Sequence, residues 1–72
     1  MKILTLLSKN IKRLRAESKI SQEELAEIAG IHRTYLSGIE REARNPTVKV
    51  ISKIAKALKV KPMELFREKD SI

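Results

Sequence analysis

The chain of 72 residues contains no cysteine, so neither a disulfide bond nor a thiolate zinc site is available to stabilise it. Only two glycines and two prolines occur against abundant Leu, Ile, Ala, Lys and Glu, a composition that favours an all-α fold. The single histidine, His32, lies at the start of an expected helix. The three glutamates of residues 21–30 lie along one expected helix. Neither a Gly-rich phosphate loop nor a cluster of metal ligands is present. We therefore predict that the protein is not an enzyme and uses no cofactor, metal ion or small-molecule substrate.

The sequence also lacks a long apolar run. The longest apolar stretch near the N-terminus, residues 3–7, is too short for the core of a signal peptide or for a bilayer span. A cytoplasmic protein without membrane contacts is predicted. Its length corresponds to one domain, residues 1–72, whose small core needs tight helix packing or oligomerisation for extra stability.

Positive charge is abundant and unevenly distributed. The formal net charge is +7, with 16 lysines and arginines. Residues 1–20 carry six basic side chains and one acidic, residues 21–30 carry three acidic and none basic, and residues 31–61 carry eight basic and two acidic. Lysines that merely solubilise a helical surface do not require such segregation. The charge pattern predicts a polyanionic partner, a class that includes double-stranded DNA.

Residues 22–40 form the most informative stretch, QEELAEIAGIHRTYLSGIE. Leu25 and Ala29 lie on one face of a first short helix, and Leu36 and Ile39 lie on one face of a second. Gly30 stands where a helix is best ended by a residue with positive φ. Two helices joined by a tight Gly-containing turn are the helix-turn-helix signature. The alternative is a generic helical hairpin in a bundle core.

The remaining periodicity predicts a compact five-helix all-α domain. The expected helices span residues 5–18, 21–29, 33–41, 48–58 and 62–67. Thr5 or Ser8 is expected to cap the first helix, and Thr47 the fourth. Ser21 and Glu24 are spaced as a capping box at the start of the second helix.

The exposed face of the helix over residues 33–41 is short and polar enough to enter a major groove. An arginine there can bind guanine in bidentate fashion, and a threonine can bond a base edge or contact a thymine methyl. Gly38 in mid-helix costs about 0.5–1 kcal/mol relative to Ala, which indicates close approach by the preceding helix or by DNA. The base-reading candidates are Arg33, Thr34, Tyr35 and Ser37.

Other polar residues are candidates for contacts with the DNA backbone. Gln22 lies at a helix N-terminus, where its amide can donate a hydrogen bond to a phosphate. Basic and amide side chains elsewhere add attraction that does not depend on base sequence. The complete set of backbone candidates is Gln22, Arg13, Arg44, Asn45 and Lys49.

Residues 50–66 carry more apolar surface than one small core accommodates. The apolar arc of the fourth helix covers roughly 180°, although a core-facing stripe needs little more than about 100°. The apolar side chains of the last helix cannot all point inward. We predict a homodimer whose interface includes Val50, Ala57, Met63, Leu65 and Phe66. The alternative is that the last helix only closes the monomer core.

SQEELAEIAGIHRTYLSGIE, followed by a basic loop, NPT and an apolar helix ending KIAKAL, resembles the Cro and lambda-repressor type of helix-turn-helix domain. The resemblance covers nearly all of residues 8–66 and implies five helices, with the second motif helix in the major groove of DNA. His32-Arg33-Thr34-Tyr35-Leu36-Ser37, Ile39-Glu40-Arg41 and Arg44-Asn45 look like the controller proteins of restriction-modification systems.

This resemblance implies a transcription regulator that binds a near-palindromic operator as a homodimer. It implies that Gln22 contacts a phosphate, that Arg33, Thr34 and Ser37 read bases, and that Tyr35 adds to them. It also implies a largely buried ion pair between Arg15 and Glu40. In many relatives a Ser or Asp precedes the short fifth helix, and this chain has Lys61 at that position. The alternative is a phage-type repressor or antitoxin-like regulator whose main role includes binding a protein partner.

Overall fold

The computed structural model describes residues 2–68, and its regular elements in that range are all helical. In chain order the elements are α1 (Ile3–Ser18), α2 (Gln22–Ala29), α3 (Arg33–Glu40), α4 (Val48–Ala57) and the 3₁₀ helix η1 (Pro62–Phe66). The all-α prediction is confirmed for the described residues. The prediction of five α-helices is wrong, because the last element is a single short 3₁₀ segment.

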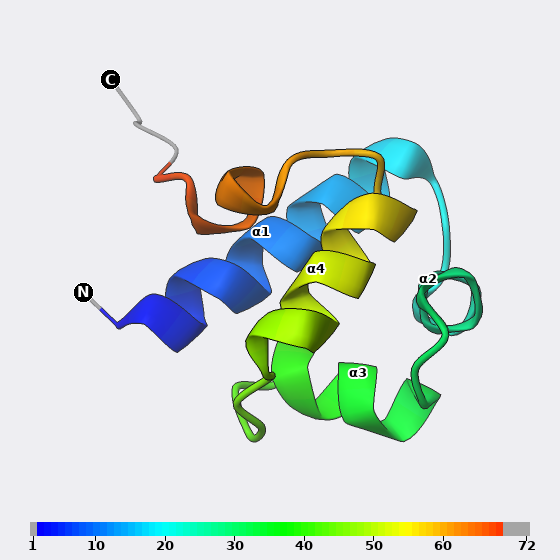
Figure 1. The fold of residues 1–72 in the computed structure, drawn as a ribbon, viewed down its shortest axis with the longest axis horizontal. Helices are drawn as coiled ribbons and strands as arrows, with labels where there is room; N and C mark the ends of the chain where they lie inside the picture. Colours follow the sequence, from blue (N-terminus) through cyan, green and yellow to red (C-terminus); the bar gives the residue numbers. More distant parts are fainter. Residues whose placement is uncertain (1, 69–72) are drawn as a thin grey trace.

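The 3₁₀ helix η1 contacts both α1 and α4 (Figure 1). Helix α2 packs against α3 and α4, and α3 also contacts α1. In Figure 1, α2 and α3 lie on the side of the molecule opposite η1. The helix-turn-helix pair α2–α3 therefore forms one end of the molecule.

Every element contributes a fully buried aliphatic side chain to one core. Leu14 of α1 is only partly buried at the edge of this core. Within residues 2–68 no buried side-chain nitrogen or oxygen lacks a hydrogen-bond partner. The fully buried large apolar residues are Leu7, Ile11, Leu25, Leu36, Ile39, Ile54 and Leu65.

The local signals at the helix ends are confirmed. Ser21 Oγ accepts a hydrogen bond from the Glu24 amide at 3.0 Å, and the Glu24 carboxylate accepts one from the Ser21 amide at 2.8 Å. Gly30 ends α2 with φ of 72°. Thr47 Oγ1 accepts from the Val50 amide at 3.1 Å and caps α4. Each of these devices acts within one turn of its own helix.

The predicted start of α1 is wrong. The helix begins at Ile3 after Lys2, whose side chain makes no cap hydrogen bond. Thr5 Oγ1 instead donates a hydrogen bond to the Glu42 carboxylate at 2.7 Å, and Ser8 Oγ donates to the Thr5 carbonyl inside the helix. A charged acceptor makes a stronger hydrogen bond than a neutral one, which explains why Thr5 points to the loop after α3.

The placement of η1 depends on one buried amide of α1. Asn10 is only 3% exposed, and its Nδ2 donates to the carbonyls of Leu65 and Arg67, each at 2.9 Å. Lys61 at the N-cap offers no side-chain hydrogen bond. Leu65 is 0% exposed and belongs to the monomer core. Its predicted place in a dimer interface is wrong, because the hydrogen bonds of Asn10 hold this segment with Leu65 pointing inward.

The helices of residues 2–68 are each too short or too polar to cross a lipid bilayer.

Candidate nucleic-acid interface

A polar pocket of about 200 Å³ lies between the start of α2 and the outer face of α3. Gln22 is the first residue of α2, while Arg33 and Ser37 are four residues apart on α3 and so share one face. Arg33 and Thr34 are exposed, and Ser37 is half-buried. The residues that line this pocket are Gln22, Arg33, Thr34 and Ser37. Four of the predicted DNA-contacting residues therefore meet in one place.

Gln22 is connected to a buried ion pair. Glu40 is 6% exposed, and its carboxylate receives Arg15 Nε at 2.9 Å and Arg15 Nη2 at 3.1 Å. Gln22 Nε2 donates to the same carboxylate at 3.0 Å, and Arg15 also donates to the Ile20 carbonyl at 3.2 Å. The ion pair expected from the family resemblance is present. Its hydrogen bond to Gln22 was not foreseen, because no local spacing relates residues 22 and 40.

Arg13, one of the predicted DNA-backbone residues, is half-buried. Its Nη1 forms an ion pair with Glu17 at 3.2 Å, and its Nη2 donates to Asn10 Oδ1 at 2.9 Å. Part of its hydrogen-bonding capacity is thus used within α1. Lys49 is exposed in the first turn of α4. Neither side chain lines the polar pocket.

Gly38 is buried, and the predicted reason for its presence is wrong. Its nearest neighbour is the side chain of Arg44 from the following loop, rather than α2 or a surface open to DNA. The Arg44 guanidinium lies 6.0 Å from the ring centroid of Tyr35, which is itself half-buried against the core. Arg44 and Asn45 are both exposed. The loop after α3 therefore adds a basic side chain to the helix surface.

Arg41 was not among the predicted site residues. It is exposed at the C-cap of α3, and its Nε lies 3.5 Å from Ser37 Oγ. The two residues are four apart, a spacing that brings side chains together on a helix and that could have identified Arg41 from sequence.

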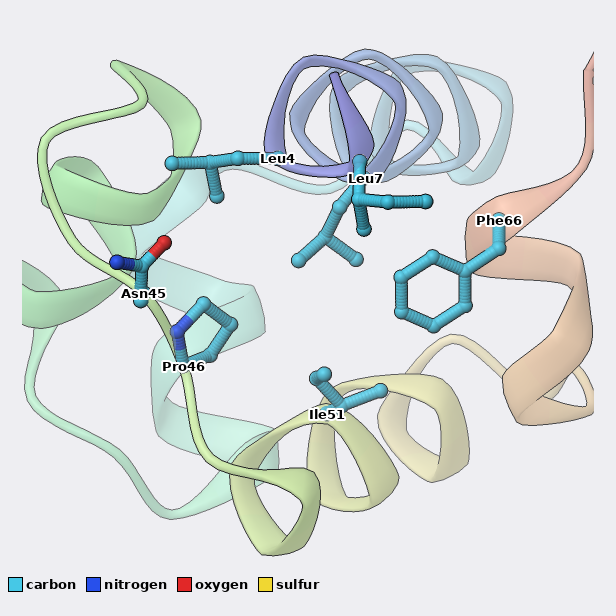
Figure 2. Close-up of a pocket in the computed structure, with 7 residues that line it drawn as sticks. Leu4, Leu7, Asn45, Pro46, Ile51 and Phe66 are labelled. Atoms are coloured by element: carbon cyan, nitrogen blue, oxygen red, sulfur yellow. The ribbon is translucent and has the colours of Figure 1, made fainter. Parts of the chain in front are cut away.

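A second, apolar pocket of about 190 Å³ lies on another part of the surface. Figure 2 shows the Phe66 ring from η1 pointing into it, with Leu4 and Leu7 of α1 on one side and Ile51 of α4 on another. Asn45 and Pro46 complete its rim (Figure 2). Ile3 also lines this pocket.

The other predicted interface residues differ in exposure. Val50 and Ala57 are half-buried against the core, whereas Met63 is 67% exposed. Within residues 2–68 no group of three or more acidic or histidine side chains is placed to hold a metal ion.

Comparisons with known proteins match the chain over most of its length. The helix-turn-helix family model covers residues 11–65. The control protein C.SmaI of Serratia marcescens is 45% identical over 58 residues, which are 81% of this chain and 69% of that protein. The crystal structure of the restriction-modification controller protein C.AhdI from Aeromonas hydrophila superposes with a TM-score of 0.85 at 40% identity. The match covers 88% of this chain and 96% of that chain.

A further controller protein has been solved with DNA. C.Esp1396I bound to a 19 base pair DNA duplex has a TM-score of 0.83 at 41% identity, covering 92% of this chain and 88% of that chain. The same protein has been solved as a tetramer in complex with its natural 35 base-pair operator. The present chain therefore belongs to the helix-turn-helix family and is similar to restriction-modification controller proteins.

Proposed function

We propose that the chain is a sequence-specific DNA-binding transcription regulator of the restriction-modification controller type, acting as a homodimer on a near-palindromic operator. The observation that carries this proposal is the polar pocket, where Gln22 of α2 meets Arg33, Thr34 and Ser37 of α3. Similarity to a controller protein solved with DNA supports the same conclusion. Helix α3 is the element that enters the major groove.

The side chains divide into readers of bases and anchors to phosphate. Arg33 has a planar guanidinium that matches guanine O6 and N7, and Thr34 is short enough to approach a base edge. Gln22 uses one Nε2 proton for Glu40, and the second proton of that amide is free to donate to a phosphate. Because Glu40 is itself fixed by Arg15, the Gln22 amide is oriented before DNA arrives.

Sequence-independent affinity comes from exposed basic residues on the loop after α3 and on α4. Each phosphate that a lysine or arginine neutralises releases condensed counterions, so binding weakens as salt rises. We assign Arg44 and Lys49 to this role, and Asn45 adds a neutral amide that can donate a hydrogen bond to a phosphate. Arg13 contributes less, because it is already paired with Glu17 and Asn10.

We assign the homodimer interface to the surface of α4 and η1. Its residues are Val50, Ala57, Met63 and Phe66. The exposed thioether of Met63 and the apolar pocket beside Phe66 are the kind of surface that a second copy of a small domain covers. Similarity to a controller protein solved as a tetramer on its operator supports this assembly. Two-fold symmetry then sets the two copies of α3 about 34 Å apart, in successive major grooves.

A binding selection tests the proposed function. Purified protein is mixed with a random duplex pool at near-physiological salt, and the recovered DNA is sequenced. We expect enrichment of a short inverted repeat whose half-sites lie about one helical turn apart. Binding that enriches no motif and only fades with rising salt contradicts sequence-specific regulation, and a complex with a protein partner then becomes the question.

Arg33→Ala and Lys49→Ala separate base reading from phosphate attraction. Arg33→Ala should cost about 1–3 kcal/mol on the selected operator and little on scrambled DNA. Lys49→Ala should weaken both DNAs alike and reduce the salt slope by about 1. Titration of labelled duplexes at several salt concentrations measures both. Equal loss on the two DNAs for both variants is inconsistent with α3 as the reading element.

A further inference from the structure

Gly38 is the chain's only glycine inside a helix, and its surroundings explain its presence. A Cβ placed on Gly38 would lie 2.5 Å from Cγ of Arg44, 3.4 Å from its Cβ and 3.8 Å from its Cδ. Real Cβ atoms do not approach another carbon to 2.5 Å. The stem of Arg44 therefore occupies the space that any larger residue at position 38 needs.

The backbone of the loop brings Arg44 to this position. Glu42 adopts φ of 63°, which turns the chain back toward α3. The amides of Ala43 and Arg44 then donate to the Gly38 carbonyl at 2.7 and 3.2 Å. The hydrogen bond from Thr5 to Glu42 ties the same loop to α1. The Cα of Arg44 is thus fixed relative to α3 from two sides.

The conformation of the Arg44 stem decides where its charge lies. Tyr35 and Gly38 are three residues apart and share a face of α3. With its stem over Gly38, the Arg44 guanidinium lies 6.0 Å from the Tyr35 ring centroid, within the range of a cation–π contact. Cγ is the first atom beyond Cβ, so only rotation about χ1 or a backbone shift can move it. Either change moves the guanidinium away from the ring.

We propose that Gly38 is a positioning residue that places Arg44 beside Tyr35, so that the loop arginine becomes part of the DNA-contacting surface of α3. This inference rests on the proposed DNA binding and extends it. Glycine at position 38 lowers the intrinsic stability of α3 relative to alanine. Its missing Cβ leaves the space that the Arg44 side chain occupies.

The first test needs no DNA. The other aromatic rings of the chain are those of His32 and Phe66. Tyr35 is the ring that the Arg44 guanidinium contacts, so its ring current probes the position of Arg44 in the proton NMR spectrum. Wild-type protein should show Arg44 side-chain protons shifted upfield, and Gly38→Ala should abolish that shift. The melting temperature of Gly38→Ala should stay the same or rise, because alanine is the better helix former. An unchanged shift in Gly38→Ala overturns the proposal.

The other glycine provides a matched control. Gly30 has φ of 72° and no atom within 4 Å of an added Cβ, so Gly30→Ala strains the backbone without displacing a neighbour. This variant should have a lower melting temperature but an unchanged Arg44 shift. Loss of the shift in Gly30→Ala would show that general destabilisation, rather than contact at position 38, controls Arg44.

The second test measures the dissociation constant for the selected operator. Arg44→Ala and Gly38→Ala should each raise it about tenfold, and the double variant should match Arg44→Ala alone. Additive losses, or wild-type affinity in Gly38→Ala, overturn the positioning role. A Gly38→Ala protein that fails to fold supports the proposal only if the double variant folds, and contradicts it if both unfold. If wild-type protein selects no operator, the proposed function fails, while the NMR result still decides the placement of Arg44.

Discussion

Glu40→Ala should lower the free energy of unfolding by about 3–5 kcal/mol, the usual cost of removing one partner from a buried ion pair. The substitution deprives Arg15 of both its carboxylate hydrogen bonds and Gln22 of its acceptor. The Arg15 side chain is 21% exposed, so water solvates part of its charge and the lower end of the range applies. A chain of this size has a total stability of about 4–10 kcal/mol, so the loss should be visible as a much lower midpoint in urea denaturation followed by circular dichroism.

Glu17→Ala is the matched control, because it removes a carboxylate from an exposed ion pair with Arg13. Exposed pairs contribute less than about 1 kcal/mol, so this variant should unfold close to the wild type. Replacing both Arg15 and Glu40 by apolar residues of similar volume should recover much of the loss from Glu40→Ala. Equal destabilisation by Glu17→Ala and Glu40→Ala would show that burial of the Arg15–Glu40 pair has no special importance.

Leu65→Ala should also lower the free energy of unfolding strongly, by about 2–5 kcal/mol. Leu65 is completely buried, and η1 contacts both α1 and α4, so the truncation leaves a cavity where three elements meet. The hydrogen bonds from Asn10 to the carbonyls of Leu65 and Arg67 hold the backbone of this segment and limit collapse of that cavity. Urea denaturation at low protein concentration measures the change.

Met63→Ala distinguishes core packing from dimer formation on the same short element. Met63 is 67% exposed, so its truncation should change the unfolding free energy of dilute protein by less than about 0.5 kcal/mol. Under the proposed assembly, the effect of Met63→Ala grows with protein concentration, because the wild-type dimer gains stability by mass action. The effect of Leu65→Ala should be present at every concentration. A Leu65→Ala variant as stable as the wild type when dilute would place Leu65 outside the monomer core.

The features that could be predicted from sequence act over one helical turn. Ser21 with Glu24, Gly30 and Thr47 each contact groups within a few residues, so the residue types alone indicate the geometry. The shared outer face of Arg33 and Ser37 on α3 followed from helical spacing in the same way. Thr5 was misassigned because its hydroxyl bonds Glu42, 37 residues away, instead of capping α1.

The last element shows the limit of such reasoning. Apolar periodicity indicated that not every side chain of residues 62–66 points inward, but it did not tell which one does. Leu65 is inside and Met63 outside in a segment that Asn10, 55 residues from Leu65, holds through the carbonyls of Leu65 and Arg67. No local sequence pattern indicates a hydrogen bond between residues so far apart in the chain.

By itself, the sequence determined the helical composition, the helix-turn-helix pair, the segregated charge and the family. These depend on residue type and on spacings of three or four residues, which any helix converts to shared faces. Only the tertiary structure decided that Gln22 bonds Glu40, that Arg44 lies over Gly38, and which apolar side chains remain exposed. An amphipathic helix can bury its apolar face against many partners. Contacts between distant residues therefore exist only once the helices have packed in one arrangement.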